Sequence, residues 1–394
     1  MYNKTSGEKI MRKVAIIGGG AAGVFCSICI KELLGDEVQV IILEKNERIG
    51  KKILSTGNGK CNLSNINIDD SYYNSRQVAY CLRKLPPNKL IEKFRSWGLY
   101  TKKDEEGRVY PYSEKATTVL DVFTKKIQEY DIKVKEFNVS HIKKTDHFLV
   151  YSKTYQLENV DYVVLATGSL ACVSENNGYK IAESLGHTIN PLRPGLVAIK
   201  TKENLKPLAG LRSKVLAKII KNKKTLWSGK GEILFRDEGV SGILVFDLSR
   251  YLDNDTILSF DLVYSEDEES LKEFLNNDPK LLSGILPKML ASEIARRYEE
   301  DMSKDLIWYL KNFILHPSTT YGFSNAQITL GGININEVDP TSFASIKTDS
   351  LYMIGEILDI DGASGGYNLH FAWASAYLAA LDIFKKIRGK IDEK

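Results

Sequence analysis

Cysteine and histidine are scarce in this sequence, which has five of each among its 394 residues. An odd number of cysteines at irregular spacings does not suit a disulfide framework, and no metal-ligand spacing links the cysteines and histidines. Cys26 and Cys29 form a C-x-x-C pattern, but they fall inside an almost wholly apolar helical stretch. Free cysteine behaves there as a small hydrophobic residue. We therefore expect packing rather than redox chemistry from this pair, and no metal site.

Long apolar runs and a strong charge are missing as well. No stretch reaches the length of about 18 apolar residues that a membrane-spanning helix needs, and the start, MYNKTSGEKIMRK, lacks the apolar core of a signal peptide. The net charge is +4 with both signs interspersed, which does not favour nucleic acid or a membrane as the main partner. We therefore expect a cytoplasmic protein without a membrane partner, acting on a small-molecule substrate.

The first motif that the sequence does contain is a glycine-rich turn. The stretch 14–23, VAIIGGGAAG, is typical of a buried strand followed by G-x-G-x-x-G and by a helix from Ala21 to Leu34. Gly18 permits the tight turn, Gly20 lets the backbone approach a pyrophosphate, and Gly23 lets the helix pack on the strand. The pyrophosphate would bind the free amide groups at the start of the helix. The alternative is a close-packed turn without a ligand.

A second strand, Val38 to Leu43, strengthens this interpretation. It ends in Glu44, at about the spacing that places a carboxylate on the adenosine ribose. An acid there pairs with a free 2′-hydroxyl group, which favours FAD or NAD over NADP. The turn and the acid together predict a bound adenine dinucleotide.

The next stretch, Arg48 to Asn65, is rich in Gly, Asn and Ser, and we expect it to be a loop without regular structure. Long loops inside compact domains are usually functional, although a solvated surface loop is the alternative. The basic residues Arg48, Lys51 and Lys52 are suited to offset phosphate charge. Cys61 and Asn62 are expected to lie further along the cofactor, towards its reactive ring.

The segments GGGAAG and EKNERIGKKILSTGNGKCNLSN resemble the bacterial HI-type FAD-dependent oxidoreductases. These are also called aminoacetone oxidase family flavoproteins, and they include a bile-acid 3-dehydro-Δ4,6-reductase. The resemblance runs from about Met11 to Ile387, and a more distant one leads to fumarate reductase and L-aspartate oxidase flavoproteins. It implies an α/β fold: a Rossmann-like FAD-binding domain of the glutathione reductase type, with an inserted β-barrel-like domain.

Two later segments complete the expected flavin fold. Residues 161–169, DYVVLATGS, suit a central parallel strand, and Gly168 would let the chain pass close to the cofactor. Residues 350–383 are typical of a last strand, a glycine-rich loop and a buried helix. The resemblance implies that Glu356 stands where related flavoproteins bind the ribityl chain. The loop before the helix would place amide groups near the flavin pyrimidine edge, where negative charge grows on reduction. A plain turn and helix is the alternative.

The middle of the chain changes to hairpins near Pro191, and further on to helical spacing. We expect antiparallel strands over 131–157, strand runs around a turn over 232–250, and a loop over 316–326. The expected domains are a polar lead-in (1–10), an FAD-binding domain (11–190 and 337–394), an inserted β domain (191–262 and 318–336) and a helical subdomain (263–317).

The candidate site residues follow from these motifs and from the resemblance. The candidates for catalysis are Cys61, Asn62, Asp237 and Tyr367. Asp237 lies in FRDEGVSGI, where many family members have F-T-H-x-G-x-S-G-P, so it stands in place of a histidine. For His370, we expect packing rather than catalysis. The candidates for cofactor binding are Gly18, Gly20, Ala21, Ala22, Gly23, Glu44, Lys45, Lys51, Gly57, Asn58, Gly59, Cys61, Asn62, Ala166, Thr167, Gly168, Gly355, Glu356, Gly362, Gly365, Gly366, Tyr367 and Asn368.

The single dinucleotide fingerprint predicts one built-in FAD, with NADH or NADPH as a transient electron donor. We expect a flavoenzyme that moves a hydride between flavin N5 and a small organic substrate held between the FAD domain and the insertion. Reduction of an activated C=C bond fits the bile-acid relative, and oxidation of a small amine fits the other family name. A non-catalytic redox sensor or RNA-associated flavoprotein, using the basic 212–230 hairpin, is the alternative from another class.

Overall fold

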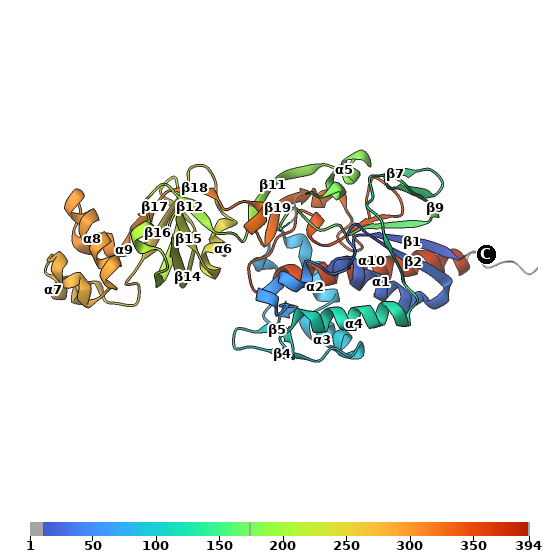
Figure 1. Cartoon of the computed structure of the whole chain (residues 1–394), viewed down its shortest axis with the longest axis horizontal. Coiled ribbons are helices and arrows are strands. Elements are labelled where there is room, and N and C mark those ends of the chain that lie inside the picture. The colour runs from blue at the N-terminus through green and yellow to red at the C-terminus, as the bar shows by residue number, and fades with distance from the viewer. Residues whose placement is uncertain (1–10, 173–174, 393–394) are drawn as a thin grey trace, which may run out of the picture. The chain divides into compact units, whose positions relative to one another are not determined.

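A computed structural model describes residues 11–172 and 175–392 of the chain (Figure 1). The expected lead-in, residues 1–10, lies outside the described residues. The chain forms two compact units, with boundaries between Arg193 and Pro194 and between Gln327 and Ile328. Unit 1 combines the two ends of the chain and unit 2 is the segment between them. Each unit has its own hydrophobic core.

Unit 1 is built on a five-stranded sheet in which every neighbouring pair of strands is parallel. The sequence runs of the central strands are apolar because both faces of such a sheet are covered. Helix α1 (Ala21–Leu34) and the long helix α10 (Tyr367–Asp392) belong to the same core. This is the Rossmann-like α/β arrangement that the sequence predicts. The strand order is β20 (Leu351–Met353), β10 (Tyr162–Leu165), β1 (Arg12–Ile17), β2 (Val38–Glu44) and β6 (Lys133–Glu136).

The expectation of antiparallel strands over 131–157 was wrong for its first strand. Strand β6 pairs parallel with β2 and forms the edge of the main sheet. The strands that follow it, β7 (His141–Lys144), β8 (Phe148–Tyr151) and β9 (Gln156–Val160), form a separate antiparallel sheet. All four residues of β6 are exposed, so its sequence carries no apolar pattern that would reveal its partner.

The remaining elements of unit 1 surround the main sheet. Strands β3, β5 and β4 form a small antiparallel sheet, and β11 pairs with β19. Strand β19 belongs to unit 1, although we expected it in the insertion. The remaining elements are η1 (Gly35–Glu37), η2 (Ile53–Gly59), β3 (Ser64–Asn65), η3 (Asp70–Tyr72), η4 (Arg76–Val78), α2 (Ala79–Lys84), α3 (Pro87–Ser96), β4 (Thr101–Lys103), β5 (Arg108–Pro111), α4 (Ala116–Glu129), α5 (Asn177–Ser184), β11 (Ile189–Gly195, which crosses the unit boundary), β19 (Ile328–Ile333), η8 (Ile335–Glu337) and η9 (Gly355–Ile357).

Unit 2 contains a seven-stranded antiparallel sheet whose two edge strands are consecutive in the chain. Only His316 separates the edge strands β17 (Phe313–Leu315) and β18 (Pro317–Thr320). The sheet must therefore curve until its edges approach each other, which is the barrel-like form that the resemblance implied. Between the edges lie, in order, β16 (Ile257–Asp261), β13 (Arg212–Lys221), β14 (Lys224–Arg236), β15 (Gly239–Ser241) and β12 (Ile199–Thr201).

Two local expectations in unit 2 were wrong. Strand β18 lies inside the segment 316–326, which we expected to be a loop. Helix α6 (Ile243–Ser249) lies inside the segment 232–250, which we expected to form strands. The helix buries Leu244, Val245 and Leu248, and so short an apolar run does not distinguish a strand from a buried helix.

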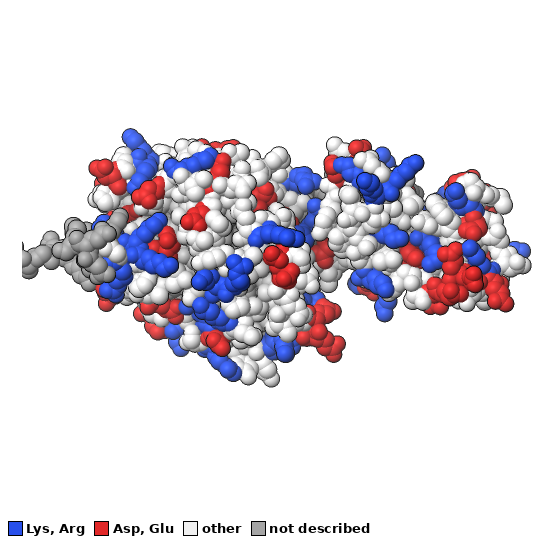
Figure 2. All heavy atoms as spheres, turned by 180° about the vertical axis from the view of Figure 1, so that it is seen from behind, with Lys and Arg blue, Asp and Glu red and all other residues white. Residues whose placement is uncertain are grey.

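The helical part of unit 2 consists of α7 (Glu268–Leu275), η6 (Pro279–Gly284), α8 (Lys288–Glu300) and α9 (Leu306–Lys311). Figure 2 shows acidic side chains gathered at the end of this unit that carries α7, whereas both signs are interspersed elsewhere on that face. Over the described part of the chain, no helix has the length and apolar character needed to cross a membrane.

Candidate cofactor site and active site

The glycine-rich turn between β1 and α1 has one crowded side and one open side. Gly18 has a φ of +105°, and a Cβ atom there would lie 2.5 Å from the Ala166 carbonyl oxygen. A Cβ atom on Gly23 would lie 2.0 Å from the Gly18 oxygen, whereas one on Gly20 would meet nothing within 4 Å. Helix α1 begins on the open side with no side-chain cap. Its first amide groups are therefore available to an anion such as a pyrophosphate.

Glu44 lies beside this turn at the end of β2. Its buried carboxylate accepts hydrogen bonds from the Gly19 amide at 2.7 Å and from the Asn46 amide at 2.9 Å. The bond from Gly19 holds the carboxylate against the turn, where the sequence predicts the adenosine ribose. The neighbouring Lys45 is exposed and donates to the Glu175 carbonyl oxygen at 2.7 Å.

The expected irregular loop over 48–65 is partly helical, because it contains the 3-10 turns of η2. The Gly50 amide donates to the Gly19 oxygen at 2.8 Å, which attaches the segment to the glycine turn. Gly57 and Asn58 have φ values of +55° and +54°. Lys51 is exposed, while the next residue, Lys52, places its ammonium 2.6 Å from the Glu356 carboxylate.

Cys61 and Asn62 follow this turn and are both buried. Cys61 has no exposed surface, and burial raises the pKa of its thiol to about 12, so the thiol stays protonated at neutral pH. The Asn62 Oδ1 atom has no hydrogen-bond partner among the described residues. A Cβ atom on Gly366 would lie 2.7 Å from that oxygen. The glycine therefore allows the loop before α10 to pack directly on the segment that carries Asn62.

Further contacts join this loop to the rest of unit 1. Asn65 donates its side-chain amide to the Gly365 oxygen at 3.2 Å, and the Tyr73 hydroxyl donates to the Tyr367 oxygen at 2.8 Å. The Asn368 side chain accepts from the Gly362 amide at 2.8 Å and donates back to its oxygen. The buried ring of Tyr367 stacks on Tyr72 with 4.3 Å between ring centroids. The structure thus brings Gly362, Gly365, Gly366, Tyr367 and Asn368 together with Asn62.

His370, in α10, has a structural role in the same region. Its Nε2 atom lies 2.8 Å from the Leu85 carbonyl oxygen and its Nδ1 atom 2.8 Å from the Ser64 hydroxyl. Because a carbonyl oxygen only accepts, Nε2 carries the proton and Nδ1 accepts from Ser64. Complete burial lowers the pKa of His370 to about 4. The imidazole is therefore neutral and holds strand β3 against α10.

The end of β10 carries the predicted Ala-Thr-Gly. The Ala166 amide donates to the Ile17 oxygen at 2.8 Å, and Gly168 has a φ of +69°. A Cβ atom on Gly355 would lie 2.9 Å from that of Ala22, so the start of η9 packs on the start of α1.

Three polar atoms in this region are buried without a hydrogen-bond partner among the described residues. They are Thr167 Oγ1, Glu356 Oε1 and the hydroxyl of Tyr179 on α5. Such groups are normally paired in native proteins, so the donor and acceptor set fits a polyhydroxylated cofactor such as FAD. Sequence reasoning missed Tyr179, because a tyrosine on a short amphipathic helix is typical of ordinary core packing.

Asp237 belongs to unit 2, at the exposed turn between β14 and β15. It borders a surface hollow of about 370 Å³ that is also lined by Lys200, Lys202, Glu238 and Ser318. The Lys200 ammonium pairs with Glu238 at 2.6 Å. The other catalytic candidates lie in unit 1, and the role of Asp237 stays a prediction.

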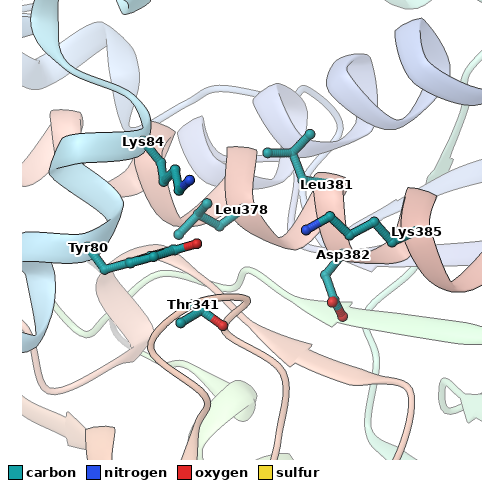
Figure 3. A pocket seen from close by; sticks show the side chains of 7 residues that line it. All are labelled: Tyr80, Lys84, Thr341, Leu378, Leu381, Asp382 and Lys385. Carbon is teal, nitrogen blue, oxygen red and sulfur yellow. The ribbon is translucent and has the colours of Figure 1, made fainter.

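A second hollow, of about 120 Å³, lies on unit 1 along the C-terminal half of α10. Figure 3 shows Tyr80 and Lys84 reaching it from α2, and Leu378, Leu381 and Lys385 from α10. None of these residues is among the predicted site residues. The hollow is therefore separate from the candidate cofactor site.

Comparison with known proteins adds independent information. A family model described as HI0933-like protein Rossmann domain matches residues 12–382. A 3-dehydro-bile acid delta(4,6)-reductase of Clostridium scindens is 34% identical, over 94% of this chain and 98% of its own length. A ribosomal RNA dihydrouridine synthase of Haemophilus influenzae is 28% identical, again over 94% of this chain and 98% of its own length.

Among solved structures, a 3-ketosteroid Δ1-dehydrogenase from Sterolibacterium denitrificans matches with a TM-score of 0.53. The match covers 95% of this chain and 99% of that one, at 12% sequence identity. At this identity the similarity establishes a shared fold over the matched part of the chain and nothing about the reaction.

Proposed function

The chain belongs to the HI0933-like family and is an FAD-dependent oxidoreductase, and from this premise we propose that it reduces a carbon–carbon double bond conjugated with a carbonyl group. The main support for this proposal is the chain's 34% identity with the 3-dehydro-bile acid reductase over nearly the full length of both proteins. The name of that relative describes a 3-ketone conjugated with 4,6 double bonds. The expected substrate is therefore a small enone or dienone.

The second relative, the ribosomal RNA dihydrouridine synthase, supports reduction of the same class of bond. Dihydrouridine forms when the C5–C6 double bond of uridine, which is conjugated with the C4 carbonyl group, is reduced. Two relatives with different substrates thus share one reaction type. Reduction of such a bond requires a hydride at an electron-poor carbon of the conjugated system, stabilisation of the negative charge that develops towards the carbonyl oxygen, and a proton at a second carbon.

FAD, when bound, supplies the hydride, and this chain's residues must supply the charge stabilisation and the proton. The amide groups of Gly365 and Gly366, at the start of α10, suit the stabilisation of a developing negative charge. A proton donor must touch the substrate. Cys61 has no exposed surface, whereas the side chain of Tyr367 keeps 5% exposure and Asp237 is exposed, so we favour Tyr367 or Asp237 over it.

The electron donor is part of the proposal. With one dinucleotide fingerprint, the chain has a resident site for FAD alone, so NADH or NADPH would act as a transient donor. Oxidation of a small amine is the alternative reaction, in which the organic substrate itself reduces the flavin.

An anaerobic experiment tests the proposal. The FAD-loaded protein is mixed with NADH or NADPH until the flavin absorption bleaches, and a 3-keto-4,6-diene bile acid is then added. We expect the flavin absorption to return and the product to gain two hydrogens by mass spectrometry. If amines bleach the flavin while neither nicotinamide does, the oxidase alternative is correct.

Ribosomal RNA is the second candidate substrate, and the β13–β14 hairpin is the observation in its favour. The hairpin carries the outward lysines Lys214, Lys218 and Lys230, and the Lys230 ammonium lies 5.1 Å from the centroid of the Tyr264 ring. Cations beside an aromatic ring suit nucleic-acid binding. Apart from the acidic end that carries α7, both charge signs are interspersed over the face seen in Figure 2, which is why we rank RNA second.

A charge-reversal variant separates the two substrates. Replacing the three outward lysines of the hairpin by glutamate should abolish salt-dependent binding to ribosomal RNA fragments if RNA is the substrate. The same variant should reduce the bile-acid enone at the wild-type rate if the substrate is a small molecule. Binding to RNA that the variant retains in full would remove the hairpin from consideration.

A further inference from the structure

Three buried polar atoms around the end of strand β10 have no hydrogen-bond partner among the described residues. They are Thr167 Oγ1, the Tyr179 hydroxyl and Glu356 Oε1. Because nearly all buried polar atoms in native proteins are paired, three unpaired atoms in one region indicate that a ligand pairs with them. Tyr179 is the member of this set with no assigned role.

Contacts around Gly178 place the three atoms in one neighbourhood. A Cβ atom on Gly178 would lie 2.0 Å from Thr167 Oγ1 and 2.8 Å from Cδ1 of Ile357. The Thr167 hydroxyl therefore contacts the backbone of Gly178, directly before Tyr179. The side chain of Ile357, which follows Glu356, contacts the same backbone. Burial and then the negative charge of Glu356 raise the pKa of Tyr179.

The unpaired atoms define the chemistry of the ligand. The other oxygen of Glu356, Oε2, lies 2.6 Å from the Lys52 ammonium, so Oε1 is the oxygen left to accept a hydrogen bond from a ligand. A carboxylate oxygen only accepts, while the hydroxyls of Thr167 and Tyr179 both donate and accept. The matching ligand group therefore carries several hydroxyls.

FAD has two such parts, the adenosine ribose and the ribityl chain. Glu44, on the far side of the glycine turn, is the residue expected at the ribose. We propose that Tyr179 binds the ribityl chain of FAD, together with Thr167 and Glu356. This inference rests on the cofactor and is independent of which substrate the enzyme reduces.

The test compares two tyrosine variants in the full chain, Tyr179→Phe and Tyr352→Phe. The Tyr352 hydroxyl is a matched control, because Tyr352 is also buried but donates to Asp382 at 2.7 Å. FAD affinity is measured by quenching of flavin fluorescence, and stability by thermal unfolding of the FAD-free chain. We expect Tyr179→Phe to raise the FAD dissociation constant about fivefold, as the loss of one neutral hydrogen bond implies, and Tyr352→Phe to leave it unchanged.

The effects of the two variants on the melting temperature of the FAD-free chain should be the reverse of their effects on FAD affinity. Tyr179→Phe removes no hydrogen bond from the FAD-free chain, so its melting temperature should equal or exceed that of the wild type, while that of Tyr352→Phe should fall. An unchanged FAD affinity, or a fall in melting temperature like that of the control, would overturn the proposal. ADP, which lacks the ribityl chain, should bind wild type and Tyr179→Phe equally. A fivefold loss of ADP affinity would overturn the ribityl assignment.

Discussion

Glu44 ends strand β2 with its carboxylate held by the amides of Gly19 and Asn46. If it also binds the adenosine ribose, replacing it by glutamine keeps an oxygen for the Gly19 amide and removes the charge. A hydrogen bond to a charged group contributes roughly 1.5–3 kcal/mol, so we expect Glu44→Gln to weaken FAD binding about tenfold or more in a fluorescence titration. Glu47→Gln, at an exposed position three residues on, is the control. Equal flavin retention in both variants would refute the ribose role.

His370 predicts a specific dependence of stability on pH. Its pKa is about 4 in the folded chain against an ordinary value of 6.5, so between these pH values the unfolded chain binds a proton that the folded chain does not. Stability is therefore lost as pH falls from 6.5 towards 4, by on the order of 3 kcal/mol, and no further below that.

The measurement is urea unfolding of the wild type and of His370→Gln over this pH window. The wild type should lose more stability on acidification than the variant does, because glutamine does not titrate. His141→Gln, which changes an exposed residue of β7, should behave as the wild type. Parallel pH profiles for wild type and His370→Gln would contradict the assignment.

Residues whose role follows from local geometry are the ones that the sequence predicts well. Gly18 and Gly23 stand at positions where any side chain would collide with backbone, and a spacing pattern records that constraint directly. Tyr179 is different, because its unpaired hydroxyl depends on Thr167 and Glu356, which lie on other elements of the fold. No pattern within α5 carries that information.

At the scale of elements, the start of α1 has one glycine that we expect to serve ligand binding, Gly20, and one that serves packing, Gly23. Gly20 has an ordinary φ of −78° and an open surrounding, so Gly20→Ala should leave the melting temperature of the FAD-free chain unchanged while weakening FAD binding. Gly23→Ala must push the helix away from the Gly18 oxygen, and such overpacking costs about 1–3 kcal/mol. We expect it to lower both the melting temperature and the affinity. Equal effects of the two variants on the melting temperature would contradict this division.

Elements with a clear period were predictable, and those defined by long-range pairing were not. Helix α1 begins and ends where the sequence predicts, because its glycine start and apolar run are local signals. Strand β6 joins the main sheet without an apolar pattern of its own. Helix α6 has an apolar run that suits either a strand or a buried helix. In both cases the structure of the segment depends on the element that packs against it, and the segment's own sequence does not identify that element.

At the scale of the whole molecule, the chain has two hydrophobic cores that share no residues. The glycine turn, Glu44 and the loop before α10 all belong to unit 1, so we expect FAD to stabilise that unit alone. Calorimetry of the full chain should show two transitions. At an FAD concentration about 100 times the dissociation constant, the stabilisation is roughly 2.7 kcal/mol, which for a unit of this size moves one transition up by about 5–10 °C and leaves the other in place. Glu44→Gln should reduce the shift at the same FAD concentration. A single transition would show that the units unfold together, and two that rise equally would show that the barrel-like insertion depends on the cofactor unit for its stability.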